Sequence, residues 1–373
     1  MKAFLYTILI RILSVLPVTR KKVLFMSYYG SQYGCSPKYL SEYITQHHKD
    51  WKVVWAFTEP QKHSIPGILK VRYLSFRYFY ELCTSQVIIT NYRMTSLFHK
   101  RKGQTYIQTW HSSLRLKMIE KDAESSLPPH YVEMAKKDSL QIDYLLSGCA
   151  YSTSIFQRCF WYDGPILPTG TPRNDVLFHP NVSLKKKIKE RLQIPEQTKV
   201  VLYAPTFRKG NSMECYNLNY TQLIHSLQKQ QNTDWVVLVR LHPHLRNLSQ
   251  SLLKDEKQVL DVTDYDDIQE LLCIADMVIS DYSSLIFDFA MTARPCFLYV
   301  PDLKAYTSKD RSLYFNIREL PFPISLTNEE LCHQIERFQI NSYQKQVTSF
   351  LDTIGSYETG QACEKVFNYL SSL

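Results

Sequence analysis

Glycine is scarce in this chain, at 10 of 373 residues, and the nine cysteines form no C-x-x-C pair. The odd number of cysteines, several of them inside apolar runs, indicates free and mostly buried thiols in a reducing cytoplasm, because a disulfide framework needs pairs and a zinc site needs tighter clustering. No internal repeat, low-complexity tract or heptad pattern occurs. With disulfide-rich, repeat and low-complexity classes excluded, the sequence is that of an ordinary globular chain.

The composition indicates a globular protein of two domains with anionic partners. Hydrophobic residues make up 45% of the chain and charged residues 21%, and 373 residues are too many for one ordinary core. The formal net charge of +9 favours nucleic acid, phosphorylated metabolites or an anionic membrane surface. No basic-aromatic motif accompanies this charge, so we expect no nucleic-acid partner.

The apolar N-terminal stretch is too short to span a bilayer because Arg11 interrupts it, and no small-residue cleavage site of a signal peptide follows. Thr7, Arg11 and Ser14 would form one polar stripe on an otherwise apolar helix, and basic residues occupy positions 20–22. This pattern predicts a helix within residues 1–20 that lies in an anionic membrane interface. The alternative is a terminal helix packed on the protein's own core.

Short apolar runs rich in β-branched residues alternate with helical patterns and fall into two sets. The first set comprises 23–27, 52–57, 86–90, 105–110 and 142–147, and the second comprises 199–204, 235–240, 258–262, 276–280 and 296–300. Runs buried on both faces and separated by helices predict doubly wound parallel sheets. We therefore expect an α/β fold with two Rossmann-like domains facing across a cleft, at 21–180 and 195–373, with a hinge region at 179–198.

Ligands of such sheets bind beyond the carboxyl ends of the strands, so the residues there are the candidates. The run 276–280 is followed by Asp281, and Ser283 and Ser284 open a predicted helix, with Ser283 as its N-cap. The N–H groups of a helix start, its dipole and two hydroxyls would seat a phosphate without a Gly-rich loop. Against this interpretation, serine caps helices of every kind.

Three further candidates follow strands of the second half. Thr206 and Arg208 follow the run 199–204, and His242 follows the run 235–240. An arginine, a histidine and hydroxyls that converge on one cleft suit a diphosphate, although each of them alone is more often a surface residue.

The first half offers a candidate base and a tight turn. His111 follows a strand and is a candidate general base, with a structural histidine as the alternative. Gly30 lies in the turn after the first strand and is a candidate substrate contact. In the second half, Asp264, Asp266 and Asp267 form either a metal site or, more commonly, a helix cap.

Several motifs in a fixed order resemble one known family. They are WHSSLRLKMIEKD, LPTGTPRNDVLF, LYAPTFRKG, VRLHP and the segment from DYDDIQELL to VPDLKAY. Together they resemble the CDP-glycerol glycerophosphotransferase family, which builds or primes teichoic acids and related capsular polymers. The resemblance implies a GT-B architecture and transfer of glycerol phosphate from CDP-glycerol to a hydroxyl of a polyprenyl-diphosphate-linked saccharide, with release of CMP.

The resemblance also implies roles for particular residues. His111 would be the catalytic base, and the N-terminal domain would bind the acceptor. The C-terminal domain would hold the donor diphosphate through Arg208, His242, Ser283 and Ser284. The enzyme would act as a peripheral protein at the cytoplasmic face of the cell membrane, and we expect no cofactor and no metal.

This sequence departs from the family pattern in two respects. Ser112 stands where many members have glycine after the motif histidine, and the chain lacks the long extra N-terminal region of the large polymerases. The identity of the acceptor therefore stays open, and so does the question whether the enzyme adds one unit or many. So do CDP-ribitol as the donor, a UDP-sugar glycosyltransferase on the same fold, and a membrane-bound scaffold without catalysis.

Overall fold

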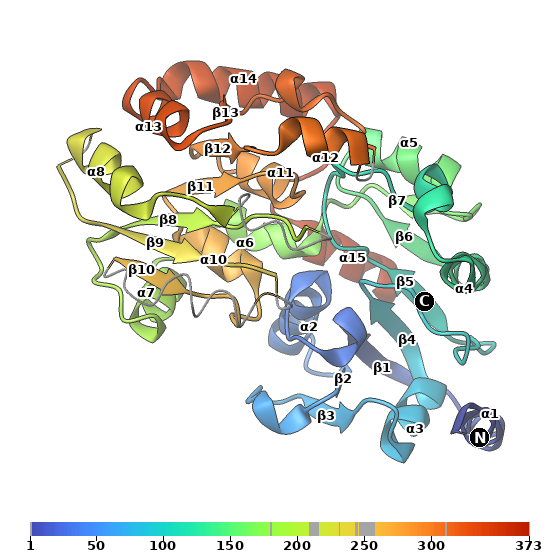
Figure 1. The fold of residues 1–373 in the computed structure, drawn as a ribbon. Helices are drawn as coiled ribbons and strands as arrows, with labels where there is room; N and C mark the ends of the chain where they lie inside the picture. Colours follow the sequence, from blue (N-terminus) through green and yellow to red (C-terminus); the bar gives the residue numbers. More distant parts are fainter. Residues whose placement is uncertain are drawn as a thin grey trace. The chain divides into compact units, whose positions relative to one another are not determined.

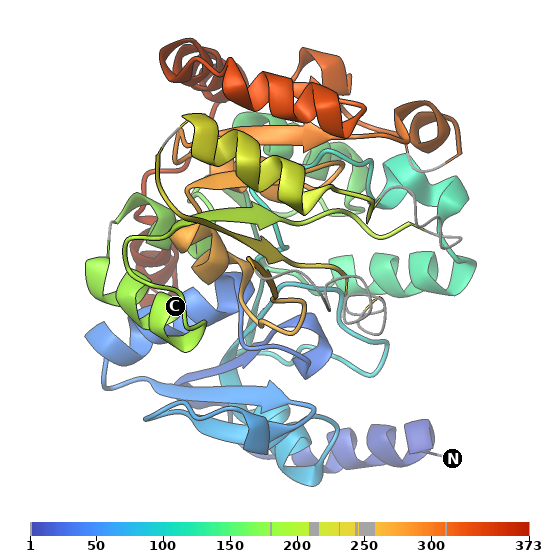
Figure 2. The ribbon, with the colours of Figure 1, turned by 60° about the vertical axis from the view of Figure 1, so that its left-hand side comes forward.

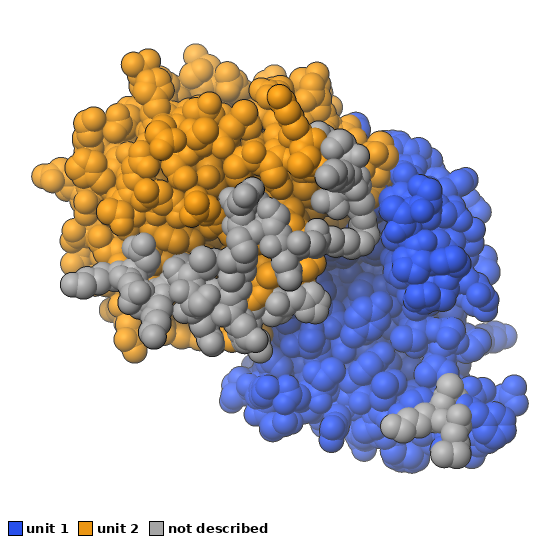
Figure 3. All heavy atoms as spheres, viewed as in Figure 1, with its two compact units in different colours: residues 1–113, 119–175, 356–373 blue, residues 114–118, 176–355 orange. Residues whose placement is uncertain are grey.

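A computed structural model describes residues 2–179, 181–208, 216–230, 232–242, 245, 258–309 and 312–372. The chain divides into two compact units (Figure 3). Unit 1 comprises residues 1–113, 119–175 and 356–373, and unit 2 comprises residues 114–118 and 176–355. Each unit is a parallel sheet with helices packed on it (Figure 1). The expected α/β class with two doubly wound sheets is thus confirmed.

Unit 1 is built on a seven-stranded sheet in the order β3-β2-β1-β4-β5-β6-β7. Its strands are β1 (Thr19–Met26), β2 (Lys52–Phe57), β3 (Leu69–Arg72), β4 (Ser85–Thr90), β5 (Thr105–Gln108), β6 (Tyr144–Leu146) and β7 (Ile166–Leu167). The strand order reverses between β1 and β4, so their carboxyl ends flank the switch point at which open α/β sheets bind ligands.

Helices from both ends of the chain cover the sheet of unit 1. They are α1 (Lys2–Leu13), η1 (Tyr28–Gly30), α2 (Cys35–His47), η2 (Pro60–Lys62), α3 (Phe76–Thr84), η3 (Glu120–Ser126), α4 (Pro129–Ser139), α5 (Ala150–Cys159), η4 (Pro172–Asn174) and α15 (Ala362–Ser371). The C-terminal α15 packs on α2, and Phe367 stacks on His48 with ring centroids 3.5 Å apart. The carboxylate of Asp175 accepts the backbone N–H of Cys363 at 2.7 Å.

Unit 2 repeats the same plan with six strands in the order β10-β9-β8-β11-β12-β13. These strands are β8 (Lys199–Tyr203), β9 (Trp235–Val239), β10 (Val259–Asp261), β11 (Met277–Ser280), β12 (Cys296–Tyr299) and β13 (Ile324–Ser325). Tyr203 of β8 is in register with Val239 of β9 and Ile279 of β11. The order reverses between β8 and β11, which places the switch point of unit 2 there.

The helices of unit 2 lie on both faces of its sheet (Figure 2). They are α6 (Asp175–Phe178), which begins in unit 1, α7 (Val182–Arg191), α8 (Tyr220–Gln230), α10 (Ile268–Ile274), α11 (Leu285–Ala290), α12 (Leu303–Lys309), η7 (Ile317–Glu319), α13 (Asn328–Glu336) and α14 (Ile340–Thr353). Helices α8 and α13 pack together on one face, where Leu223 and Leu331 join alternate strand residues such as Val201 and Val237 in one buried core.

The ten predicted strands are confirmed, although β1 begins at Thr19 and therefore earlier than position 23. Three strands were not predicted: β3 has four residues, and β7 and β13 have two each. All three lie at or beside the edge of a sheet. Runs this short carry no recognisable apolar pattern.

The division into units differs from the expected boundaries in three places. Residues 356–373 belong to unit 1 because α15 buries its apolar side on α2. Residues 114–118 belong to unit 2. The expected hinge region 179–198 contains α7, which packs on α10 within unit 2. Its polar sequence reflects a helix that buries only one of its own residues, Ile188.

Helix α1 packs on α3 with one side and exposes the other. Ser14, expected on the polar stripe, lies against Cys83 with Oγ 4.0 Å from Sγ, and the ring centroids of Tyr6 and Phe79 are 4.9 Å apart. The exposed apolar side chains of this segment are Phe4, Leu5, Ile8, Ile12 and Val15. In the part of the chain that the structure describes, no helix is long and apolar enough to cross a bilayer.

Candidate functional site

The carboxyl ends of four neighbouring strands in unit 2 carry the candidate residues of the second half. Thr206 and Arg208 follow β8, His242 follows β9, and Asp281 follows β11 together with the serine pair. Asp302 follows β12, the next strand of the sheet. Because β8 and β11 border the switch point, these side chains lie where a doubly wound sheet binds its ligand.

Arg208 is the centre of a buried ion cluster. Only 5% of its surface is exposed, and its Nη2 donates to Asp281 Oδ2 at 2.8 Å while its Nε donates to Asp302 Oδ2 at 2.7 Å. Nη1 donates to the carbonyl oxygen of Thr206 at 2.6 Å. Burial alone would lower the pKa of Arg208, but the two carboxylates raise it above its ordinary value. The cluster therefore carries two negative charges around one positive charge.

Two stacked tyrosines lie against this cluster. The rings of Tyr282 and Tyr306 are parallel within 2°, with centroids 3.6 Å apart. The Arg208 guanidinium lies 4.9 Å from the first ring centroid and 4.8 Å from the second, at cation–π distance. Burial, with Asp302 and Asp281 adding to it, raises the pKa of Tyr282, so its hydroxyl stays protonated and donates to Asp302 Oδ1 at 3.2 Å.

Asp281 also fixes the loop after β8. Its carboxylate accepts the backbone N–H of Thr206 at 2.9 Å and the N–H of Tyr282 at 2.5 Å. The hydroxyl Oγ1 of Thr206 is buried and has no hydrogen-bond partner within the described ranges. His242 is exposed, and its ring centroid lies 5.1 Å from that of Phe207. A buried hydroxyl without a partner and an exposed imidazole, each after a neighbouring strand, are both suited to contact a polar ligand.

The serine pair opens helix α11, but one residue later than expected. Leu285 is the first helical residue and Ser284 the N-cap, whereas Ser283 was predicted to cap. Ser283 Oγ accepts the N–H of Leu285 at 3.5 Å, and Ser284 Oγ accepts the N–H of Leu116 at 3.3 Å. Since α11 has only six residues, its dipole adds little, and the two hydroxyls carry whatever affinity for phosphate this turn has.

His111 follows β5 in unit 1 and is held by a backbone carbonyl. Its Nδ1 lies 3.1 Å from the carbonyl oxygen of Asn91, which follows β4. A carbonyl only accepts, so Nδ1 is the donor in this contact, and in the neutral form of the ring the lone pair is therefore on Nε2. The preceding Trp110 has φ +53°, a left-handed conformation that is rare for a bulky residue and is found more often at functional sites.

Gly30 is explained by packing alone. Its φ is +81°, and a Cβ atom on it would lie 3.1 Å from the carbonyl oxygen of Ala56 and from the amide nitrogen of Thr58. Thr58 N also donates to the carbonyl of Gly30 at 2.8 Å. The glycine is therefore needed for the approach of β2 to the turn, and its contact with a substrate remains a prediction.

The acidic cluster before α10 includes a helix cap. Asp267 is the N-cap of α10, and its Oδ1 accepts the N–H of Gln269 at 3.2 Å, which confirms the capping alternative for this residue. The described cysteines are free and buried, as expected. Across the described ranges, no group of three or more His, Cys, Asp or Glu side chains is arranged to hold a metal ion.

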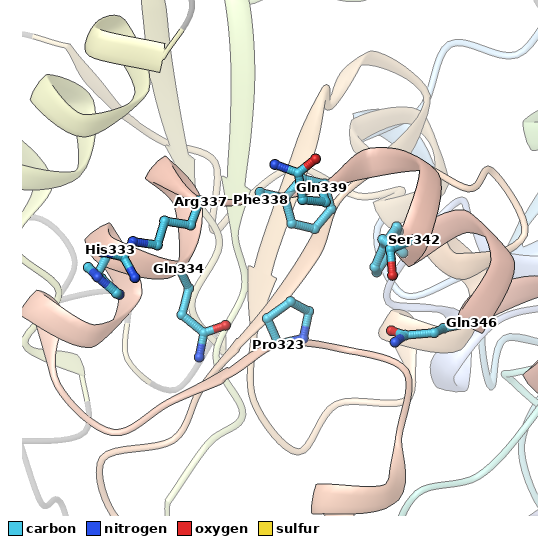
Figure 4. A pocket seen from close by; sticks show the side chains of 9 residues that line it. Pro323, His333, Gln334, Arg337, Phe338, Gln339, Ser342 and Gln346 are labelled. Carbon is cyan, nitrogen blue, oxygen red and sulfur yellow. The ribbon is translucent and has the colours of Figure 1, made fainter.

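A separate hollow of about 390 Å³ lies in unit 2 between α13 and α14 (Figure 4). Its lining includes His333, Arg337 and Gln346, and none of the residues predicted as a site belongs to it. We therefore assign the site of unit 2 to the strand ends.

Sequence reasoning missed three contributors to these sites. Asp302 lies three residues beyond β12, so the rule that selected Thr206 and Asp281 would also have selected it. Tyr306 and Asn91 carried no comparable signal. The stacking of Tyr306 on Tyr282, and the carbonyl that Asn91 offers to His111, exist only in the folded chain.

Comparison with known proteins connects the chain to one family. A profile described as CDP-Glycerol:Poly(glycerophosphate) glycerophosphotransferase matches residues 8–372. The chain is 34% identical to the teichoic acid poly(glycerol phosphate) polymerase of Bacillus subtilis over 97% of this chain and 50% of that protein. It is 34% identical to the teichoic acid glycerol-phosphate transferase of Staphylococcus aureus over 95% of this chain and 94% of that protein. The chain thus spans about half the length of the first relative and nearly all of the second.

Solved structures give the same relationship. The wall teichoic acid polymerase TagF superposes with a TM-score of 0.86 at 30% identity, over 98% of this chain and 93% of that chain. A TagF variant soaked with CDPG matches with the same score, identity and coverage. The GT-B-like fold class expected from the sequence is confirmed.

Replacing Arg208 tests the ion cluster. Arg208→Ala leaves Asp281 and Asp302 buried without their cation, a change that typically costs about 3–5 kcal/mol. We expect the melting temperature to fall by about 6 °C or more, since about 1 kcal/mol corresponds to about 2–4 °C in a unit of this size. The matched control is Arg318→Ala, which removes an exposed arginine from the same unit and should leave the melting temperature nearly unchanged. Equal melting temperatures for the two variants would contradict the structural role of the cluster.

Proposed function

Since the chain belongs to the CDP-glycerol:poly(glycerophosphate) glycerophosphotransferase family, we propose that it transfers glycerol phosphate from CDP-glycerol to a hydroxyl of a polyprenyl-diphosphate-linked saccharide, in teichoic acid or capsular polymer synthesis. The observation that supports this proposal is that Thr206, Arg208, His242 and the serine pair all follow strands that lie at or beside the switch point of unit 2. This is where a doubly wound sheet binds a nucleotide.

In this proposal, unit 2 is the donor domain. The hydroxyls of Thr206, Ser283 and Ser284 donate to oxygens of the diphosphate, and His242 adds an exposed N–H donor. Arg208 contributes differently from what its charge predicts. Because Asp281 and Asp302 already compensate its guanidinium, its main role is to hold the three loops in place. A direct contact between Arg208 and the diphosphate remains a prediction.

The proposed reaction is an in-line displacement at phosphorus. The acceptor hydroxyl oxygen attacks the β-phosphorus of CDP-glycerol, and the bond from that phosphorus to the bridging oxygen breaks. CMP leaves with the bonding electrons, and the hydroxyl proton passes to Nε2 of His111. A neutral His111 is required for this step. Its carbonyl partner suits that requirement, because it fixes the tautomer without adding a negative charge that would favour the imidazolium.

The acceptor in this proposal is anchored in a membrane, and α1 supplies a surface for docking there. Phe4, Ile8 and Ile12 recur every four residues and form one outward stripe, with exposures of 69%, 39% and 61%. Phe76 at the start of the adjacent α3 is 64% exposed. Arg11 on the same helix is exposed, as is Arg20 at the start of β1, whereas Lys21 is paired with Asp50 at 2.6 Å. An apolar stripe flanked by basic residues fits a peripheral protein on an anionic membrane surface at the cytoplasmic face.

The donor is tested by CMP release from CDP-glycerol, with CDP-ribitol and a UDP-sugar in parallel. We expect turnover with CDP-glycerol, and we expect Ser283→Ala to weaken donor binding about 10–150-fold, because a hydrogen bond to a charged group contributes about 1.5–3 kcal/mol. Ser349→Ala, at an exposed serine of α14, is the control and should behave as wild type. Turnover confined to the UDP-sugar would refute the proposed chemistry, and turnover confined to CDP-ribitol would correct the donor.

His111 is tested by separating binding from rate. His111→Ala should retain CDP-glycerol binding in calorimetry, while the rate falls by about 10²–10⁴-fold because the general base is lost. His99→Ala is a matched control, since His99 also lies in unit 1 with Nδ1 near a backbone carbonyl, that of Leu97. If the His111 variant loses donor binding but retains its residual rate, the residue serves the donor site or the core and is not the base.

The membrane surface is tested by charge substitution within the exposed stripe. Ile8→Glu combined with Ile12→Glu should release the protein from anionic liposomes, because two carboxylates replace apolar contacts and repel the lipid. Both side chains are exposed, so turnover of a soluble short-chain acceptor should persist. The control adds the same charge at Leu140 and Val182, two exposed apolar residues outside α1. Co-sedimentation of both double variants with liposomes would place docking elsewhere on the basic surface.

A further inference from the structure

Residues 114–118, which we name the strap, are a segment of unit 2 inserted into the sequence of unit 1. The strap pairs antiparallel with the segment that follows α12. Met118 N donates to the carbonyl oxygen of Ser312 at 2.9 Å, and Tyr314 N donates to that of Leu116 at 2.8 Å. These backbone hydrogen bonds hold the strap on unit 2, and contacts of Leu116 and Lys117 add to them.

The strap also contacts the residues proposed to bind the donor. Leu116 N donates to Ser284 Oγ at 3.3 Å. Lys117 Nζ lies 5.4 Å from the ring centroid of Tyr306, which stacks on Tyr282 beside Arg208. The strap therefore contacts the serine pair through one backbone amide and the stacked tyrosines through one lysine.

Ser284 is shared between the strap and the proposed ligand. A hydroxyl can accept one hydrogen bond and donate another at the same time. Ser284 Oγ accepts from Leu116, so its own O–H remains suited to donate to a diphosphate oxygen. A bound donor that orients this hydroxyl would therefore also strengthen its bond to the strap.

The strap begins three positions after the proposed base in the sequence. Only residues 112–115 separate His111 from Leu116 in the sequence, and Ser112, Ser113, Leu114 and Arg115 are all buried. Because the backbone is continuous over these few residues, we expect a displacement of the strap to reach the backbone of His111.

We infer that the strap positions His111 in response to the donor, with Ser284, Leu116 N–H and Lys117 as its anchors. This inference rests on the proposed function, since His111 is the group whose position matters. Lys117 is a positioning residue here and does not touch the reacting atoms. Its loss should lower the rate of the chemical step and leave donor affinity nearly unchanged.

The first test is a comparison of kcat with KM in variants of Lys117. Lys117→Met keeps roughly the length of the side chain and removes the cation. We expect kcat to fall about tenfold, which is within the range of energies of a partly buried cation–π contact. KM for CDP-glycerol should change less than about threefold. Lys117→Arg retains a cation over the ring and should restore kcat to within about threefold of wild type. Lys304→Met, at an exposed lysine of the same unit, is the control. An increase in KM at constant kcat would overturn the inference by making Lys117 a donor contact, and unchanged constants would overturn it as well.

The second test asks whether Lys117 acts through His111. If it does, Lys117→Met should change the residual rate of the His111→Ala enzyme by less than about twofold, because the base that it positions is already absent. A further tenfold loss in that background would show independent effects and overturn the inference.

A readout without catalysis separates this inference from the proposed function. In hydrogen–deuterium exchange, CDP-glycerol should slow the amides of residues 114–118 in the wild type, and Lys117→Met should reduce that slowing because one of the three anchors is lost. If the wild type releases no CMP while the strap amides still slow on addition of CDP-glycerol, the proposed function fails and the coupling between donor and strap stands. If CMP is released but the strap amides do not respond, the inference alone fails.

Discussion

The ion cluster of Arg208 with Asp281 and Asp302 is the interaction on which the unit 2 site depends. The sheet hydrogen bonds end with the strands, so nothing in the ladder itself fixes the loops after β8, β11 and β12. One guanidinium joins these three loops, and Asp281 additionally binds the amide of Thr206. Buried carboxylates around a buried guanidinium tolerate little displacement, because each loses its compensation if it moves. The positions of the hydroxyls at this edge follow from that constraint.

Unit 1 fixes its candidate base by neutral contacts instead. Asn91 accepts the N–H of Tyr28 on its side chain and the Nδ1–H of His111 on its backbone, and so connects the ends of β1, β4 and β5. A carbonyl partner orients the ring and adds no negative charge that would favour the imidazolium. The two units therefore share a sheet plan and differ in the chemistry at the switch point, with paired charges in one and a fixed tautomer in the other.

The net charge of the chain describes this site poorly. A charge of +9 predicts anionic partners, and Arg208 was predicted to meet the diphosphate with its charge. In the folded chain its charge is compensated by two carboxylates, and the polar groups suited to meet a ligand are hydroxyls and an exposed imidazole. A cation selected from the sequence for its charge can thus serve the site mainly by holding other residues in place.

The sequence by itself determined the fold class and the residues at the strand ends. Apolar runs buried on both faces specify parallel strands, and the order of a doubly wound sheet then brings the residues after β8, β9 and β11 to one edge. These features depend on local pattern and on topology, which the linear chain encodes. Only the tertiary structure decided that Arg208 is paired, that α15 belongs to unit 1 and that residues 114–118 belong to unit 2. Each of these depends on contacts between segments far apart in the sequence. No periodicity in the sequence links such segments, and many pairings of segments would be equally compatible with their local patterns. Burial in the folded chain selects one of them.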